Sequence, residues 1–192
     1  MRPRAALVRG TLVGCTIRLG SNEGQLVSMH PAALATPDLL KHVTESRTKR
    51  SGPGGQHRNK TQTAVVLVHE PTAISAEGSE RRSQNENRQV ALKRLRLRLA
   101  IEHREPAGIE ASELWRSRVR GRRLVISAAH PDFPALLAEA LDRLREERWQ
   151  IPPAAHKLGV STSQLLGLCE KAPAAWAAVN RQRQSVGLPA LK

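Results

Sequence analysis

The sequence predicts an α+β protein, in which a small mixed β-sheet packs with a long helix and carries an exposed glycine loop, followed by a small all-α module similar to a helix-turn-helix. Three observations support this fold class. The run TAVVLVH at 63–69 is β-branched and apolar, the stretch 83–103 contains no glycine or proline, and apolar residues recur at helical spacing after Pro134.

Cap and turn residues predict the first elements. Thr36 offers an N-cap with Pro37 at the first helical position, which predicts a short helix over about 37–42. The polar segment 42–50 is expected to be partly extended, and the four breakers at 52–55 exclude regular structure there. After the strand at 63–69 a turn follows, and residues 73–77 predict a return strand.

A capping box opens the long helix, because Glu86 lies three residues after Ser83. Leucines alternate with arginines over 95–99, a pattern that could equally describe a strand, but the length and the cap favour a helix. We expect one helix face to contact the sheet and the other to face solvent or RNA, the first with Leu92, Leu95 and Leu99 and the second with Arg94 and Arg98.

Residues 105–134 are expected to be irregular around one short apolar run, 124–126, which could form a last strand. Five arginines surround that run, namely Arg116, Arg118, Arg120, Arg122 and Arg123. They form either a second phosphate-facing patch or a solvated basic surface, and the sequence leaves both interpretations open.

The last third predicts a helical module. Pro134 opens a helix with apolar residues at 137, 140, 141 and 144, and Pro152-Pro153 opens a second that ends at Gly159. Ser161 and Gln164 form another capping box, and residues 174–186 supply a final helix. We therefore expect three segments: a flexible extension or non-native start at 1–28, a domain at 29–130 and the module at 135–192.

Composition indicates a polyanionic partner. Lysine and arginine number 31 against 17 acidic residues, a formal net charge of +14. No apolar run approaches the roughly 20 residues that span a bilayer, so we expect nucleic acid rather than a membrane as partner. Aromatic residues make up only 2%, which favours phosphate contacts over base stacking.

Cys15 and Cys169 lie far apart without a neighbouring cluster of metal ligands. We expect no metal, no cofactor and no disulfide, which fits a reducing cytoplasm. A monomer is expected.

A Gly-Gly-Gln tripeptide at 54–56 is informative because of its context. It lies inside SGPGGQHRNKTQTAVVLVHEPT, and RRSQNEN follows at the start of the long helix. This combined pattern resembles the peptidyl-tRNA hydrolysis domain of class I peptide chain release factors, including the small, codon-independent ribosome-rescue members. The resemblance covers about residues 40–104.

The resemblance implies hydrolysis of the ester between a nascent peptide and tRNA, with the ribosome, its RNA and peptidyl-tRNA as partners. Gly54 and Gly55 let the backbone approach RNA closely. As in the family, the backbone amide of Gln56 would donate to the oxyanion that forms. The chain supplies no general base of its own, so the ribosome is expected to complete the site. The family also implies a glutamine methyltransferase that acts on Gln56.

Eight further residues are expected to contact RNA, namely His57, Arg58, Asn59, Lys60, Arg82, Gln84, Asn87 and Arg88. Several of them could instead cap or brace local structure, and Ser83 is better explained as an N-cap. The chain departs from the family at two positions: Arg58 replaces a common valine, and Ala73 stands where glycine is usual.

No codon-reading domain is recognisable, so we expect release without stop-codon recognition. The small rescue members carry a basic tail, whereas residues 135–192 hold eight basic and five acidic residues and would bind RNA or a ribosomal protein, or simply stabilise the catalytic domain. A second hypothesis is a non-catalytic nucleic-acid-binding regulator that uses a helix-turn-helix at 156–166. Its second helix offers hydroxyl and amide side chains but no basic residue before Lys171.

Overall fold

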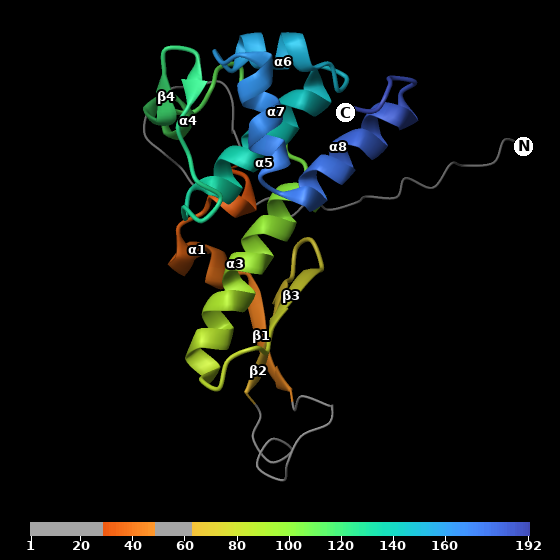
Figure 1. Cartoon of the computed structure of the whole chain (residues 1–192). Coiled ribbons are helices and arrows are strands. Elements are labelled where there is room, and N and C mark those ends of the chain that lie inside the picture. The colour runs from red at the N-terminus through yellow and green to blue at the C-terminus, as the bar shows by residue number, and fades with distance from the viewer. Residues whose placement is uncertain (1–28, 49–62) are drawn as a thin grey trace, which may run out of the picture.

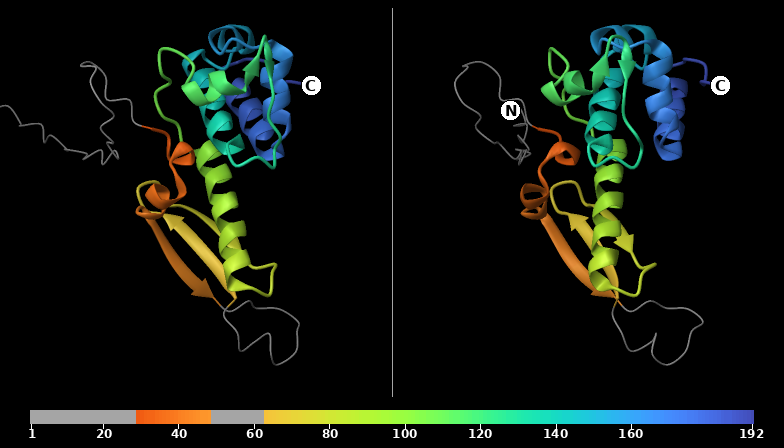
Figure 2. Two further views of the ribbon diagram at one scale, coloured as in Figure 1. Left: turned by 90° about the vertical axis from the view of Figure 1, so that its left-hand side faces the viewer. Right: turned by 60° about the vertical axis from the view of Figure 1, so that its left-hand side comes forward.

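The computed structural model describes residues 29–48 and 63–192, and within them it shows a long central helix between a small β-sheet and a group of shorter helices (Figure 1). The helix is α3, Gln84–Glu102, and the two further views show the sheet beside its first half and the shorter helices beyond its other end (Figure 2). The predicted α+β class is confirmed.

The sheet contains β1 (Val43–Thr48), β2 (Ala64–His69) and β3 (Ile74–Gly78) in that order. Both pairings are antiparallel, so the prediction of a mixed sheet is wrong. The reason lies in the connections: the four residues at 70–73 between β2 and β3 can join antiparallel strands but are too few for the crossover that a parallel pair requires. The strands predicted at 63–69 and 73–77 are confirmed to within one residue.

A short 3-10 helix, η1 (Pro31–Ala33), precedes α1 (Thr36–Leu40). The helix predicted at 37–42 therefore exists but begins earlier, and the expectation that Thr36 is its N-cap is wrong. Ala35 holds the cap position without a side-chain hydrogen bond. The Thr36 hydroxyl instead accepts from the Arg96 guanidinium at 3.1 Å, which ties α1 to α3.

Helix α3 begins as the capping residues predict. Ser83 is the N-cap, and its hydroxyl accepts from the Glu86 backbone N–H at 3.4 Å. Leu95 and Leu99 are fully buried, and Leu92 packs partly buried against the core. Arg94 and Arg98 are exposed, but their guanidinium groups donate to the backbone carbonyls of Glu77 and Ser75, so they also anchor the helix to β3.

The region expected to be irregular contains a helix that the sequence did not predict, α4 (Glu113–Arg118), with Ser112 as N-cap. It leads into a two-stranded hairpin, β4 (Val119–Arg120) and β5 (Arg123–Leu124), which is separate from the main sheet. The last strand expected at 124–126 is thus shorter and starts one residue earlier. Trp115 of α4 is fully buried, and its Nε1–H donates to the Leu158 carbonyl at 2.8 Å.

Four helices follow, as predicted: α5 (Phe133–Glu146), α6 (Ile151–Lys157), α7 (Thr162–Glu170) and α8 (Pro173–Ser185). Gly159 has a φ of +67° in the turn between α6 and α7, and Ser161 caps α7 by accepting from the Gln164 N–H. Their buried residues join those of the sheet and α3 in one hydrophobic cluster. No helix in the described ranges has both the length and the apolar character needed to cross a bilayer.

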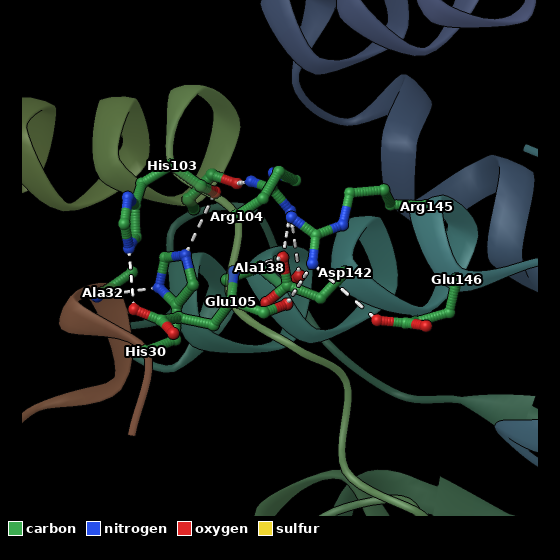
Figure 3. A network of polar contacts seen from close by, with 10 residues as sticks. His30, Ala32, His103, Arg104, Glu105, Ala138, Asp142, Arg145 and Glu146 are labelled. Carbon is green, nitrogen blue, oxygen red and sulfur yellow. Dashed lines mark hydrogen bonds and ion pairs between the residues drawn. The ribbon is translucent and has the colours of Figure 1, made fainter. Parts of the chain in front are cut away.

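A polar network joins the end of α3 to α5 and to the segment before η1 (Figure 3). The Arg104 guanidinium pairs with Asp142 at 2.8 Å, and the Glu105 N–H also donates to that carboxylate at 3.2 Å. His30 accepts from the Ala32 N–H at Nδ1 and lies 3.2 Å from the His103 carbonyl at Nε2. Burial raises the pKa of Asp142 to about 6, although Arg104 opposes this, and burial lowers the pKa of His30 to about 4.

Candidate functional site

The glycine loop is attached to the main sheet at one defined place. Thr48, the last residue of β1, pairs with Ala64, the first residue of β2, so the two points that flank the loop lie side by side. The residues expected to be catalytic, Gly54, Gly55 and Gln56, and four of those expected to contact RNA, His57, Arg58, Asn59 and Lys60, lie outside the described residues. The described part of the site is therefore the support at its base.

Asn87 forms the centre of that support. Its side chain is fully buried, and its amide donates to the carbonyls of Thr63 at 2.7 Å and Arg81 at 3.0 Å. Its side-chain oxygen accepts from the Arg81 N–H at 2.8 Å. One buried side chain thus connects the first turn of α3, the residue before β2 and the segment between β3 and α3. Because it exposes no atom, Asn87 is placed to position the base of the loop rather than to contact RNA as expected.

Gly78 lets α3 approach β3 closely beside Asn87. A Cβ added there would lie 2.1 Å from the Asn87 carbonyl oxygen and 2.9 Å from the Ala91 nitrogen, both backbone atoms that cannot move aside alone. Sequence reasoning did not single out Gly78, yet a glycine at the end of a strand is a known sign of close backbone approach. The glycine therefore sets the distance between α3 and β3 near the start of β2, where Gly78 pairs with Val65.

The remaining predicted RNA contacts surround this base. Arg82 is exposed, and Gln84 is half-buried in the first turn of α3. The Arg88 guanidinium donates to the Glu45 carboxylate at 2.7 Å, which links α3 to β1. Sequence reasoning missed Glu45, because a carboxylate in a basic exposed strand gives no signal until the partner helix is placed. Arg88 thus braces the sheet in this structure, whereas Arg82 presents its charge to solvent.

The turn at 70–73 joins β2 to β3 at the end of these strands that lies away from the start of β2. Ala73 has a φ of +56°, a conformation that costs an L-residue roughly 1–2 kcal/mol and that glycine adopts freely. Glycine is the residue expected here from the sequence resemblance, and the positive φ of Ala73 is the conformation that glycine suits best. The Thr72 hydroxyl lies 2.8 Å from His69 Nδ1 and helps to hold the turn.

No group of three or more His, Cys, Asp or Glu side chains among residues 29–48 and 63–192 is arranged to hold a metal ion. Cys169 is buried, and burial raises the pKa of its thiol to about 12. The described part of the site therefore holds the two ends of the glycine loop side by side and presents an exposed cation, Arg82, to solvent.

Comparison with known proteins matches residues 39–123 to the RF-1 domain. The chain is 45% identical over 84 residues to the mitochondrial peptide chain release factor 1-like protein of Mus musculus, a stretch that covers 41% of this chain and 22% of that protein. It is 35% identical over 107 residues to peptide chain release factor 1 of Streptomyces avermitilis, covering 52% and 30% of the two chains. Peptide chain release factor 2 of Sulfurovum is 40% identical over 78 residues, covering 38% and 21%.

The chain thus spans less than a third of the length of these relatives. The matched range begins in α1 and ends at β5, and it contains both the Gly-Gly-Gln tripeptide and the Asn87 support. Residues 39–123 therefore form an RF-1 domain, which makes the chain similar to class I peptide chain release factors over that range.

Proposed function

We propose that the chain hydrolyses the ester of peptidyl-tRNA on the ribosome and so releases nascent peptides, with Gly54, Gly55 and Gln56 as the catalytic residues. The observation that supports this most is the Gly-Gly-Gln tripeptide inside a matched RF-1 domain. Release factors of bacteria and mitochondria are among the relatives.

The chemistry follows from the residue types. Water attacks the ester carbonyl, and negative charge develops on the carbonyl oxygen of a tetrahedral intermediate. The Gln56 backbone N–H donates to that oxygen, and the neutral Gln56 side chain orients the water without the repulsion that a carboxylate would meet among phosphates. Gly54 and Gly55 leave room for RNA beside the backbone. The ribosome supplies the remaining groups of the site.

The described residues support this proposal by fixing where the loop begins and ends. Asn87 holds Thr63, and the antiparallel pairing holds Thr48 beside Ala64. A loop with two anchored ends loses less conformational freedom on binding than one with a single anchor. His57, Arg58, Asn59 and Lys60, together with Arg82 and Gln84, would contact RNA phosphates near the loop, and Arg88 would act through Glu45 and β1.

Release by this chain is proposed not to require a stop codon. The matched range covers only the RF-1 domain, and the described residues beyond it form α5 to α8. Stalled ribosomes without a codon to read are therefore the proposed substrates. Four further points stay predictions: a methyltransferase that acts on Gln56, a monomeric state, a cytoplasmic location, and domain limits at 29–130 and 135–192.

The exposed residues of α7 do not favour the alternative, a non-catalytic nucleic-acid-binding regulator that uses the C-terminal helix-turn-helix. The exposed residues of α7 are Thr162, Ser163 and Glu170, with no cation among them. The side chain of Gln164 accepts from the Leu124 N–H at 3.2 Å, so it is already used within the chain. A recognition helix needs side chains that reach base edges, and α7 offers two short hydroxyls.

The test compares Gln56→Ala with the matched control Gln89→Ala, which removes an exposed glutamine from α3. Both variants should bind purified ribosomes as the wild type does. Gln89→Ala should release labelled peptide from stalled complexes at the wild-type rate. Gln56→Ala keeps the backbone N–H but removes the side chain that orients the water, so its release rate should fall by about a hundredfold, as expected when a reacting group is misplaced. Equal release by both variants would exclude the proposal.

A further inference from the structure

The β4–β5 hairpin carries three arginines at its tip and lies outside the site described above. Arg120 ends β4, Arg122 lies in the turn and Arg123 begins β5, and all three are exposed. Gly121, with a φ of +60°, takes the first turn position, which suits a tight two-residue hairpin. The sequence alone left open whether these arginines form a phosphate-binding patch or a solvated surface.

Pairing separates these three arginines from the other two in the run. Arg118 pairs with Asp132 at 2.5 Å and Arg116 with Glu110 at 3.6 Å, so both belong to the chain's own ion pairs. In the part of the chain that the structure describes, no carboxylate lies within ion-pair distance of the three arginines at the tip. Their charge is available to a partner.

The register places two of these charges directly against each other. Arg120 pairs with Arg123 across the hairpin, where opposed side chains stand about 4.5–5.5 Å apart at Cβ. Like charges in directly opposite positions destabilise a hairpin. A bound anion between them would remove that repulsion, and arginine holds phosphate oxygens through paired N–H donors.

The hairpin has a rigid base, which a binding surface needs. The Arg122 carbonyl accepts from the Ser161 N–H at 3.1 Å, and the Leu124 N–H donates to Gln164 at 3.2 Å. Just before the hairpin, Trp115 is buried and bonded to the Leu158 carbonyl. Hydrogen bonds to the helical module therefore hold the backbone of the hairpin, from which the three arginine side chains extend.

The hairpin lies far from the point where the glycine loop begins. The views show it at one end of the molecule and the paired ends of β1 and β2 at the other, with α3 extending between them (Figures 1 and 2). The 19 residues of α3 alone measure about 28 Å at 1.5 Å per residue. A partner that meets both ends must be large and carry phosphates at widely separated places.

We infer that Arg120, Arg122 and Arg123 form a second RNA-binding surface that grips backbone phosphates of structured RNA at a distance from the proposed catalytic loop. In the setting of the proposed function, this RNA belongs to the ribosome. The surface adds affinity and orientation, and it takes no part in ester hydrolysis.

The test uses the whole chain with Arg120→Gln/Arg123→Gln. The matched control is Arg181→Gln/Lys192→Gln, which removes the same formal charge from two other exposed positions. Binding to purified ribosomes and to an RNA duplex of about 20 base pairs is measured over a salt series. The hairpin variant should bind about tenfold more weakly than the control, and its slope of log affinity against log salt should be shallower by about 1.4–1.8, because each lost phosphate contact removes about 0.7–0.9.

Two further measurements separate phosphate binding from misfolding and from recognition of an acidic protein. The melting temperature of the hairpin variant should equal or exceed that of the wild type, because the opposed charges are gone; a lower one would attribute weak binding to misfolding and overturn the inference. A polyglutamate peptide should bind the hairpin variant and the charge-matched control variant alike. A loss of polyglutamate binding in the hairpin variant alone would identify an acidic protein as the partner and overturn the inference.

Failure of this inference differs from failure of the proposed function. A wild-type chain that binds RNA through the hairpin but releases no peptide would contradict only the hydrolysis. If release occurs, the hairpin variant should need more ribosomes to reach half-maximal rate and keep the same maximal rate. A hairpin variant that matches the control in affinity, salt slope and half-maximal concentration would overturn the inference.

Discussion

The side-chain amide of Asn87 donates to the Thr63 carbonyl at 2.7 Å and thereby fixes the first turn of α3 to the residue that precedes β2. The same side chain exchanges two hydrogen bonds with the backbone of Arg81. A single buried residue therefore connects Thr63, which precedes β2, to α3 and to the segment before α3.

Asn87→Ala should lower the free energy of unfolding by about 1–3 kcal/mol, because it leaves buried backbone groups of Thr63 and Arg81 unpaired. Asn85→Ala is the control, since Asn85 is exposed two residues earlier on the same helix, and it should stay within about 0.5 kcal/mol of the wild type. Urea denaturation followed by circular dichroism measures both. Equal losses in the two variants would contradict the bracing role.

Gly78→Ala should destabilise the chain by about 1–3 kcal/mol or more, because the new Cβ would lie 2.1 Å from the Asn87 carbonyl oxygen. Gly167→Ala is the matched control, since a Cβ there meets nothing within 4 Å and the residue lies inside α7. Alanine in a helix should stabilise by about 0.5–1 kcal/mol. Urea denaturation measures the free energy of unfolding of both variants. A Gly78→Ala variant as stable as the wild type would refute the close approach of α3 to β3.

Ala73→Gly should raise the free energy of unfolding by about 0.5–1 kcal/mol. Glycine removes the cost of a φ of +56°, and part of that gain is lost to the freer unfolded chain. Ala128→Gly provides the comparison, because this exposed alanine lies in a turn without a positive φ. Glycine there should only lower the free energy of unfolding, since it makes the unfolded chain freer. Thermal unfolding of the two variants distinguishes them, and the strain at Ala73 is refuted if both melt below the wild type.

The polar network at the end of α3 predicts two opposite dependences of the free energy of unfolding on pH, and they offset each other. Between about pH 4 and 6 the folded chain keeps a proton on Asp142 that the unfolded chain has released, so the free energy of unfolding falls as the pH rises. Between about pH 4 and 6.5 the unfolded chain protonates His30 while the folded chain does not, so the free energy of unfolding rises with pH. Each contribution is on the order of 3 kcal/mol.

Asp142→Asn should therefore make the stability of the chain rise more steeply from pH 4 to 6.5 than it does in the wild type. His30→Asn, which keeps a capping side chain before η1, should make stability fall over the same range. Denaturation at half-unit pH intervals measures the slopes. Parallel profiles for the wild type and both variants would show that these groups do not titrate as burial requires.

Periodicity and caps predicted much of the fold, because they act within a few residues. The start of α3 at Ser83 and of α7 at Ser161 depends on a hydroxyl that accepts a nearby N–H, and both were predicted. The cap of α1 was not, because the Thr36 hydroxyl bonds to Arg96, a residue 60 positions away.

Long-range contacts also explain what was missed in the site. Neither the pairing of Arg88 with Glu45 nor the contact of Gly78 with the Asn87 carbonyl can be read from neighbouring residues. Asn87 was assigned to RNA because its motif matched, and only its burial shows that the side chain is used inside the protein. The four-residue connection at 70–73 is too short for a parallel crossover, so its length alone predicts the antiparallel pairing of β2 and β3.

Peptide release from purified ribosomes tests the central claim most directly, with complexes programmed by truncated, intact and stop-codon messages. The chain should release peptide from truncated-message complexes at a rate that a stop codon does not raise, and Gln56→Ala should lower that rate by about a hundredfold. Release that occurs only with a stop codon, or that survives Gln56→Ala at the wild-type rate, would contradict the account.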